Sequence, residues 1–321
     1  MGELVASAPV YSLVVPVYRN EHSLTRLLDV VGDLFDRLDA QAELVVVVDG
    51  SPDGSAELLS AQLPQWRHPS QLVLHARNFG SFSAIRTGFQ HARGDHLAVM
   101  AADLQEPIEL IEEFFAMLRR DEADVVVGRR EGRADGSSSM WSNVFWSLYR
   151  RLVVPEIPEG GVDVFGLNKM AAGELLRLGE TGTSLVAQLF WIGMRRAEVG
   201  YLRLERQEGK SAWTWRKKWA YLGDSIFAFT SLPIRMLWLL GLFGMVITLG
   251  ISVIVFVAWL TGGIPQPGYT PLMLVLLGCT FLLTAGLGIV GGYVHRAYEN
   301  TKGRPAAIVT STTSFGPASN R

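Results

Sequence analysis

The chain has 321 residues, of which 49% are hydrophobic and 19% are charged, and its formal net charge is -2. A net charge this close to zero gives no general attraction to nucleic acid, so an anionic partner would have to be held by local basic clusters. The single cysteine, Cys279, excludes a disulfide framework. The N-terminal residues lack a basic region and a long apolar core, so we expect no signal peptide and a chain that folds mainly in the cytosol.

The first 128 residues alternate short apolar runs with segments of helical periodicity. Strands that are apolar throughout and separated by helices predict an α/β domain, in which a mostly parallel sheet is covered on both faces. Helices are expected after a cap at Ser23, over residues 83–92, and over residues 107–120 with Glu106 as the N-cap. The expected strands are residues 12–17, 44–48, 72–75, 96–100 and 124–127.

Polar residues follow each of the first four strands. Because the carboxyl ends of parallel strands meet at one edge of the sheet, these residues are expected to lie where α/β proteins bind ligands. Each loop alone is equally explained as a turn, since Asp, Asn and Gly are common turn residues. Together the four loops favour a ligand site. They contain Tyr18, Asn20 and Glu21; Asp49, Gly50, Ser51 and Asp53; Arg77, Asn78, Phe79 and Gly80; and Asp103.

The following segment, residues 129–206, opens with arginines and includes an aromatic amphipathic stretch near residues 140–153. One acid, Asp163, lies in an apolar, glycine-flanked setting. Two interpretations remain open for this residue. It is either a turn or cap residue, or a carboxylate held in a pocket.

The C-terminal third predicts membrane association. No Asp, Glu, Lys or Arg occurs from Met236 to Tyr293, and runs 232–260 and 272–294 are each long enough to cross a bilayer. Before them, tryptophans and basic residues over 213–231 predict an amphipathic helix in the membrane interface. Basic residues flank the outer ends of the two spans but not their connecting loop, which predicts cytosolic termini.

Domain boundaries follow from these patterns. We expect a cytosolic catalytic domain over residues 1–212, the interfacial helix over 213–231, two transmembrane helices over 232–295 and a disordered cytosolic tail over 296–321. Gly288 and Gly292 form a small-xxx-small pair on the second span, which permits close helix packing within the chain or between protomers.

A cytosolic α/β domain tied to a membrane suggests chemistry between a soluble phosphorylated donor and a lipid acceptor. The segments PVYRNE (16–21), DGSPDG (49–54), RNFG (77–80), GD (94–95) and AADLQEP (101–107) occur in the order seen in GT-A glycosyltransferases of family two. With its two C-terminal spans, the chain resembles the polyisoprenyl-phosphate glycosyltransferase branch, similar to dolichol-phosphate mannose synthase and bactoprenol glucosyltransferases. The resemblance covers the chain up to about Arg304.

The resemblance implies a role for several residues. Asp103 would hold a divalent cation, Mg²⁺ or Mn²⁺, on the donor diphosphate, and Gln105 would face the donor sugar. Asp163 would act on the acceptor side, as a base or as an orienting group. The nucleotide-sugar pocket would contain Pro16, Tyr18, Glu21, Asp49, Ser51, Asn78, Gly80 and Ala102, and the acceptor and diphosphate groups would meet Arg129, Arg133, Arg206, Lys210 and Ser211.

Two positions depart from the family pattern. Ala101 replaces the first acid of the usual Asp-x-Asp motif, and Val48 stands where many relatives have another acid before Asp49. Because Ala101 cannot bind a metal, the cation would be held by Asp103 and the diphosphate of the donor.

The resulting hypothesis is an inverting transfer of a hexose from a nucleotide sugar, such as a UDP-hexose or GDP-mannose, to a membrane polyprenyl phosphate. The enzyme would be an integral protein of the cell (inner) membrane, a homo-oligomer, with no nucleic-acid partner. The alternative is a membrane-anchored binding or scaffold protein derived from such an enzyme, an interpretation motivated by Ala101.

Overall fold

The computed structural model describes residues 9–133, 147, 149–151, 153–158, 161–180, 184–204, 223–228, 230, 232–261 and 268–317. The chain divides into two compact units. The first consists of Met1–Trp219 together with Arg304–Arg321, and the second of Ala220–Gly303. The C-terminal residues therefore return to the unit that contains the N-terminal half of the chain.

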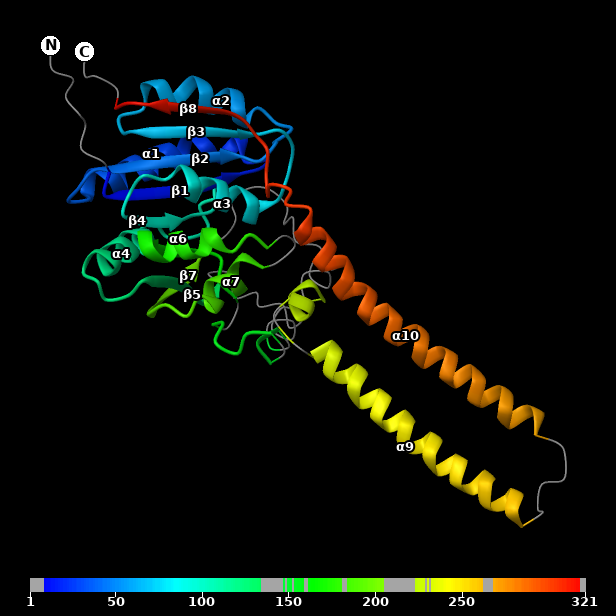
Figure 1. The fold of residues 1–321 in the computed structure, drawn as a ribbon. Coiled ribbons are helices and arrows are strands. Elements are labelled where there is room, and N and C mark those ends of the chain that lie inside the picture. Colours follow the sequence, from blue (N-terminus) through cyan, green and yellow to red (C-terminus); the bar gives the residue numbers. More distant parts are fainter. Residues whose placement is uncertain are drawn as a thin grey trace. The chain divides into compact units, whose positions relative to one another are not determined.

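An eight-stranded mixed sheet forms the centre of the first unit (Figure 1), in the order β7-β5-β6-β4-β1-β2-β3-β8. Strand β1 pairs in parallel with β2 and β4, β2 with β3, and β5 with β7, whereas β6 and β8 run antiparallel to their neighbours. The predicted α/β class and mostly parallel sheet are confirmed. The strands are β1 Tyr11–Val17, β2 Ala42–Val48, β3 Ser70–His75, β4 His96–Val99, β5 Val125–Arg133, β6 Phe165–Asn168, β7 Arg196–Arg203 and β8 Val309–Phe315.

Helices cover both faces of this sheet. Alternate residues of β1 point to opposite faces, so Leu13 and Val15 join the core beneath α1 and α4 while Val14 faces α3. Helix α6 packs beside α3 and against β4 and β6. The helices of this unit are α1 Glu21–Arg37, α2 Ser55–Gln62, α3 Ser81–His91, α4 Ile108–Arg119, α6 Lys169–Arg177 and α7 Leu185–Trp191, with a 3₁₀ turn η1 at Leu63–Gln65.

Two predicted helix caps are wrong. Helix α1 begins at Glu21 with Asn20 in the cap position, and the Ser23 hydroxyl instead donates to the carbonyls of Asn20 and Ala102. Helix α4 begins at Ile108 after Pro107, without a side-chain cap hydrogen bond. The Glu106 side chain makes no hydrogen bond to the first turn of α4, so it is not the predicted cap.

The predicted disorder of the C-terminal tail is wrong for residues 309–315. This segment forms β8, which pairs antiparallel with β3 (Figure 1). Strand β3 would otherwise end the sheet with a row of unpaired backbone groups, which a further strand can satisfy. The composition of the tail suggested disorder, but its threonines, together with Val309 and Phe315, also favour a strand once a partner is present.

The second unit contains two long helices, α9 Leu232–Leu260 and α10 Tyr269–Thr301, which contact each other. A Cβ atom at Gly286 of α10 would lie 3.1 Å from Leu237 Cδ1 of α9, so this glycine permits a close approach. Within the described residues, Gly278–Thr301 is long and apolar enough to cross a membrane. The two predicted spans are therefore helical, and their crossing of a bilayer stays a prediction. Residues 223–228 are helical, but the rest of the predicted interfacial segment lies largely outside the described residues.

Two helical glycines provide a matched test of packing. A Cβ atom at Gly88 in α3 would lie 2.2 Å from Val14 Cγ1, whereas one at Gly173 in α6 would meet nothing within 4 Å. We expect Gly88→Ala to lower the free energy of unfolding by about 1–3 kcal/mol through overpacking. Gly173→Ala should be neutral or stabilising by up to about 1 kcal/mol. Thermal unfolding of both variants in detergent checks this, and equal midpoints would contradict the α3–β1 packing.

Candidate functional site

The loops after β1 and β2 are joined by hydrogen bonds. The backbone nitrogen of Arg19 donates to Ser51 Oγ at 2.7 Å, and that of Glu21 donates to Asp53 Oδ2 at 3.1 Å. In return, the Gly54 nitrogen donates to Glu21 Oε2 at 2.9 Å. The structure thus brings predicted residues Glu21 and Ser51 together, and both side chains connect the two loops.

Asp49, at the end of β2, holds the loop that follows β3. Its Oδ1 lies 2.8 Å from His75 Nδ1 and accepts from the Phe79 nitrogen at 2.8 Å, while Oδ2 accepts from the Gly80 nitrogen at 2.8 Å. Burial disfavours the charged carboxylate, but these hydrogen bonds outweigh it and hold the pKa of Asp49 below its usual range. The residue is therefore ionised at neutral pH although it is only 2% exposed.

The loop after β2 and the loop after β3 also approach each other closely at Gly50. This glycine has a φ of +56°, and a Cβ atom there would lie 2.2 Å from the carbonyl carbon of Arg77. Exposed side chains lie in the loop after β3 and in the loop after β1. The Arg77 guanidinium lies 4.0 Å from the centre of the Phe79 ring, Asn78 is exposed, and Tyr18 is exposed after β1. Predicted residue Pro16 lies half-buried in β1.

The segment after β4 is anchored on both sides. The carbonyl of Ala102 accepts from Ser23 Oγ in α1 at 2.7 Å, and the carbonyl of Gln105 accepts from the Leu204 nitrogen at 2.8 Å, just after β7. Between them, Leu104 has a φ of +54°, a left-handed conformation that reverses the chain. Asp103 is half-buried and Gln105 is buried within this turn.

Asp163 lies in a cluster of charged residues from β5 and β7. Its Oδ2 forms an ion pair with Arg130, lies 3.2 Å from Arg203 Nη1 and accepts from the Tyr201 hydroxyl at 3.4 Å. The two arginine side chains are only 14% and 17% exposed. The cluster therefore places two largely buried guanidinium groups around one carboxylate.

A second carboxyl group, Glu106, borders this cluster. Its side chain is fully buried, neither oxygen has a hydrogen bond, and Arg203 Nη2 lies 3.7 Å away. Burial raises the pKa of Glu106 to about 7, with Arg203 opposing the shift and Asp103 adding to it. The pKa of Asp49 is therefore lowered and that of Glu106 is raised, because hydrogen bonds outweigh burial at Asp49 whereas burial dominates at Glu106.

The predicted Arg129 lies on the other face of this part of the sheet. Arg130 pairs in register with Tyr201, and because side chains alternate along a strand, Arg129 points away from Asp163. Its guanidinium forms ion pairs with Glu131 and Glu198. Arg133 ends β5, and the predicted residues Arg206, Lys210 and Ser211 lie outside the described residues.

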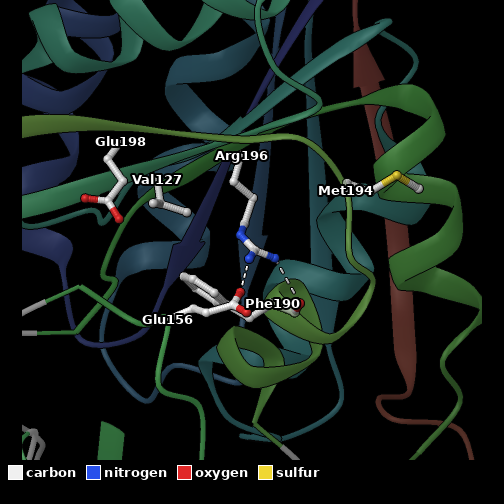
Figure 2. Close-up of a pocket in the computed structure, with 6 residues that line it drawn as sticks. All are labelled: Val127, Glu156, Phe190, Met194, Arg196 and Glu198. Carbon is white, nitrogen blue, oxygen red and sulfur yellow. Dashed lines mark hydrogen bonds and ion pairs between the residues drawn. The ribbon is translucent and has the colours of Figure 1, made fainter.

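A cavity on the face that carries Arg129 is lined by Val127, Glu156, Phe190, Met194, Arg196 and Glu198 (Figure 2). Arg196 forms an ion pair with Glu156 and donates to the Phe190 carbonyl at 3.0 Å. The cavity contains none of the predicted site residues, and its cation is already neutralised by Glu156. We therefore place the candidate site at the carboxyl ends of the parallel strands and in the Asp163 cluster.

Residues 12–176, more than half of the chain, match the sequence profile of glycosyl transferase family 2. The chain belongs to glycosyltransferase family 2. It is 28% identical to the SfII prophage-derived bactoprenol glucosyl transferase of Shigella flexneri, covering 93% of this chain and 96% of that protein. It is also 28% identical to the undecaprenyl-phosphate 4-deoxy-4-formamido-L-arabinose transferase of Sodalis glossinidius, covering 97% and 96%.

A solved structure also resembles this family-2 glycosyltransferase. The glucosyl-3-phosphoglycerate synthase from Mycobacterium tuberculosis, crystallised with Mn²⁺ and uridine diphosphate, aligns with a TM-score of 0.43 and 15% identity. The alignment covers 63% of this chain and 73% of that one. Family membership rests on the sequence match.

Four residues of the candidate site were not singled out from the sequence as site residues: His75, Arg130, Tyr201 and Arg203. The arginine pair at 129–130 did draw attention, but only the register of β5 with β7 decides which member faces Asp163. His75 ends an apolar strand, where a histidine carries no distinct signal. A search for polar residues at both ends of each predicted strand would have found it.

The buried carboxyl of Glu106 predicts a pH-dependent stability of the folded protein. Because its pKa is raised from 4.5 to about 7, the folded protein keeps a proton that the unfolded chain releases at lower pH. The stabilising contribution is complete below pH 4.5 and is lost as the pH rises through 7. Glu106→Gln has no proton to lose in this range. The difference in the free energy of unfolding between this variant and wild type should therefore grow in favour of the variant from pH 5 to 8, by up to about 3 kcal/mol.

Thermal unfolding across this pH range, in EDTA, tests the prediction. Glu109→Gln, at an exposed glutamate in the first turn of α4, is the control and should follow the wild-type curve. Parallel curves for wild type and Glu106→Gln would show that Glu106 does not titrate as described.

Proposed function

We propose that this family-2 glycosyltransferase transfers a hexose from a nucleotide sugar to the phosphate of a membrane polyprenyl lipid, with inversion at the anomeric carbon. One observation carries the proposal. The matches to a bactoprenol glucosyl transferase and an undecaprenyl-phosphate sugar transferase cover more than nine-tenths of both chains, so they include the C-terminal helices as well as residues 12–176.

The donor would bind at the loops after β1, β2 and β3. The exposed side chains of Tyr18, Arg77 and Asn78 stand at this edge and offer stacking, charge and amide contacts for a nucleotide. Such an edge is where ligands of parallel sheets bind. Asp49 is turned inward and supports the loop rather than the ligand, while Gly80, with a φ of +98°, gives the loop its turn.

A divalent cation on the donor diphosphate would be held by Asp103, with Gln105 beside it. Within the described residues no group of three His, Cys, Asp or Glu side chains is arranged to hold a metal. One carboxylate still suits Mg²⁺ or Mn²⁺, because such ions take one or two carboxylates and complete their coordination with substrate phosphates and water. When bound, the cation would neutralise charge on the departing diphosphate.

The acceptor phosphate would meet the Asp163 cluster. Arg130 and Arg203 supply two guanidinium groups suited to a phosphate, and Asp163 holds them in place. A phosphate monoester is already ionised at neutral pH, so Asp163 orients the acceptor rather than removing a proton. One phosphate oxygen bonds to the anomeric carbon from the face opposite the leaving group. The bond from that carbon to the diphosphate oxygen breaks, and the nucleoside diphosphate leaves with the electron pair.

Helices α9 and α10 would cross the cell membrane and present the domain to lipid on its cytosolic side. Large apolar side chains on both are exposed, including Leu239 at 66%, Ile254 at 69%, Leu283 at 68% and Leu287 at 71%. An apolar surface of this extent is costly in water and favourable in lipid. Association of protomers through Gly288 and Gly292 remains part of this proposal.

Incubation of the full-length protein with undecaprenyl phosphate, Mg²⁺ and a panel of UDP-hexoses and GDP-mannose tests the proposal. We expect one donor to give a polyprenyl-phosphate sugar, detected by mass spectrometry. Transfer to no lipid, together with binding of none of the donors, would refute it.

Asp103→Asn tests the proposed cation ligand. Loss of the only carboxylate proposed for the cation should lower turnover by at least about a hundredfold, judged from losses on removal of a single electrostatic contact. Asp33→Asn, at an exposed aspartate of α1, is the control and should keep wild-type turnover. An unchanged turnover in Asp103→Asn would remove Asp103 from the mechanism.

A further inference from the structure

We propose that His75 and Thr87 are positioning residues of the donor site, which act through Asp49 to hold residues 77–80 in the conformation that binds the nucleotide. The inference rests on the proposed function, because it assigns this loop to the donor. None of the motifs that carry the family resemblance contains either residue.

Chemistry gives the direction of the bond between His75 and Asp49. An ionised carboxylate can only accept, so His75 Nδ1 donates to Asp49 Oδ1 across 2.8 Å. The other ring nitrogen, Nε2, lies 3.0 Å from Thr87 Oγ1, a hydroxyl that can either donate or accept and so can hold the ring through this nitrogen. The His75 side chain has no exposed surface and Thr87 is 4% exposed, so water does not compete. The three residues link β2, β3 and α3.

Asp49, held by His75, in turn holds the backbone of residues 79 and 80. Its other hydrogen bonds come from the backbone nitrogens of Phe79 and Gly80, one to each oxygen. The Asp49 side chain is only 3% exposed, so its influence on a ligand runs through the backbone it holds. His75 sets the orientation of the carboxylate plane, because it binds the oxygen shared with Phe79.

The beginning of the loop is fixed independently. The backbone nitrogen of Ala76 donates to the carbonyl of Ile308 at 2.9 Å, and Thr310 Oγ1 donates to the carbonyl of Leu74 at 3.1 Å. Residues 77 and 78 therefore lie between two anchors, β8 on one side and Asp49 on the other. Arg77 and Asn78 are the exposed members of the loop, so their placement depends on both anchors.

The same strand provides a matched control. Gln71 is also buried on β3 and donates from Nε2 to Glu43 Oε2 of β2 at 3.0 Å. This pair repeats the arrangement of His75 and Asp49 at the amino end of the two strands, away from the loop. A substitution of Gln71 should therefore disturb the sheet to a comparable degree without disturbing residues 77–80.

Amide hydrogen exchange of the ligand-free, full-length protein in detergent tests the positioning directly. In His75→Leu, exchange of the Phe79 and Gly80 amides should be about tenfold faster than in wild type, because their acceptor is no longer held. Thr87→Val should show a smaller increase. His75→Asn, which can retain a donor to Asp49, should restore most of the protection. Gln71→Leu should leave these amides unchanged.

Binding of uridine diphosphate and guanosine diphosphate with Mg²⁺, measured by calorimetry, tests the link to the donor. For whichever nucleotide binds wild type, His75→Leu should raise Kd about tenfold, equivalent to one misplaced hydrogen-bonding contact. With the active donor, KM should rise while kcat stays within about twofold. If His75→Leu leaves both exchange and Kd unchanged, or if Gln71→Leu changes them equally, the inference is wrong.

The two proposals fail in different ways. If wild type binds neither nucleotide and transfers no sugar, the proposed function fails and the donor role of His75 fails with it. If wild type binds and transfers normally while the His75 variants match it, only the positioning role is lost. Should His75→Leu not fold, the comparison of Thr87→Val and His75→Asn with wild type decides the question.

Discussion

Parallel pairing of β1 with both β2 and β4 is the constraint on which the rest of the first unit depends. In this arrangement the strands end at the same edge, and every loop that follows a strand reaches its neighbour. The contacts from Glu21 to Gly54 and from Ala102 to Ser23 are consequences of that pairing, and the contact from Asp49 to Gly80 follows from the parallel pairing of β2 with β3. Residues distant in sequence are thereby brought together at one edge of the sheet.

Two buried carboxyl groups, Asp49 and Glu106, have pKa values shifted in opposite directions by their surroundings. Asp49 receives hydrogen bonds on both oxygens and remains ionised, whereas Glu106 has none and its pKa rises to about 7. Neither side chain has much contact with solvent, but the hydrogen bonds to Asp49 outweigh its desolvation, whereas desolvation is the largest effect at Glu106. Asp49 can therefore act as a fixed structural acceptor, while the carboxyl of Glu106 gains and loses its proton near neutral pH.

The alternation of side chains across β5 and β7 separates two environments that the sequence places side by side. Arg130, Tyr201 and Arg203 gather at Asp163, and Arg129 faces Glu198 on the opposite side. The cavity of Figure 2 belongs to that opposite face. Arg129 and Arg130 are adjacent in β5, but only Arg130 lies on the face where it can contact an anionic group beside Asp163.

The sequence by itself determined the fold class, the five strands of the first half and the polar loops that follow them, because apolar runs and turn residues are local signals. It also determined the family, through the order of short motifs, and the helical character of the two apolar segments. Only the tertiary structure decided the partners of Asp49, the choice of Arg130 over Arg129 and the pairing of β8 with β3. These depend on register and on contacts between residues far apart in the chain, for which no local pattern exists.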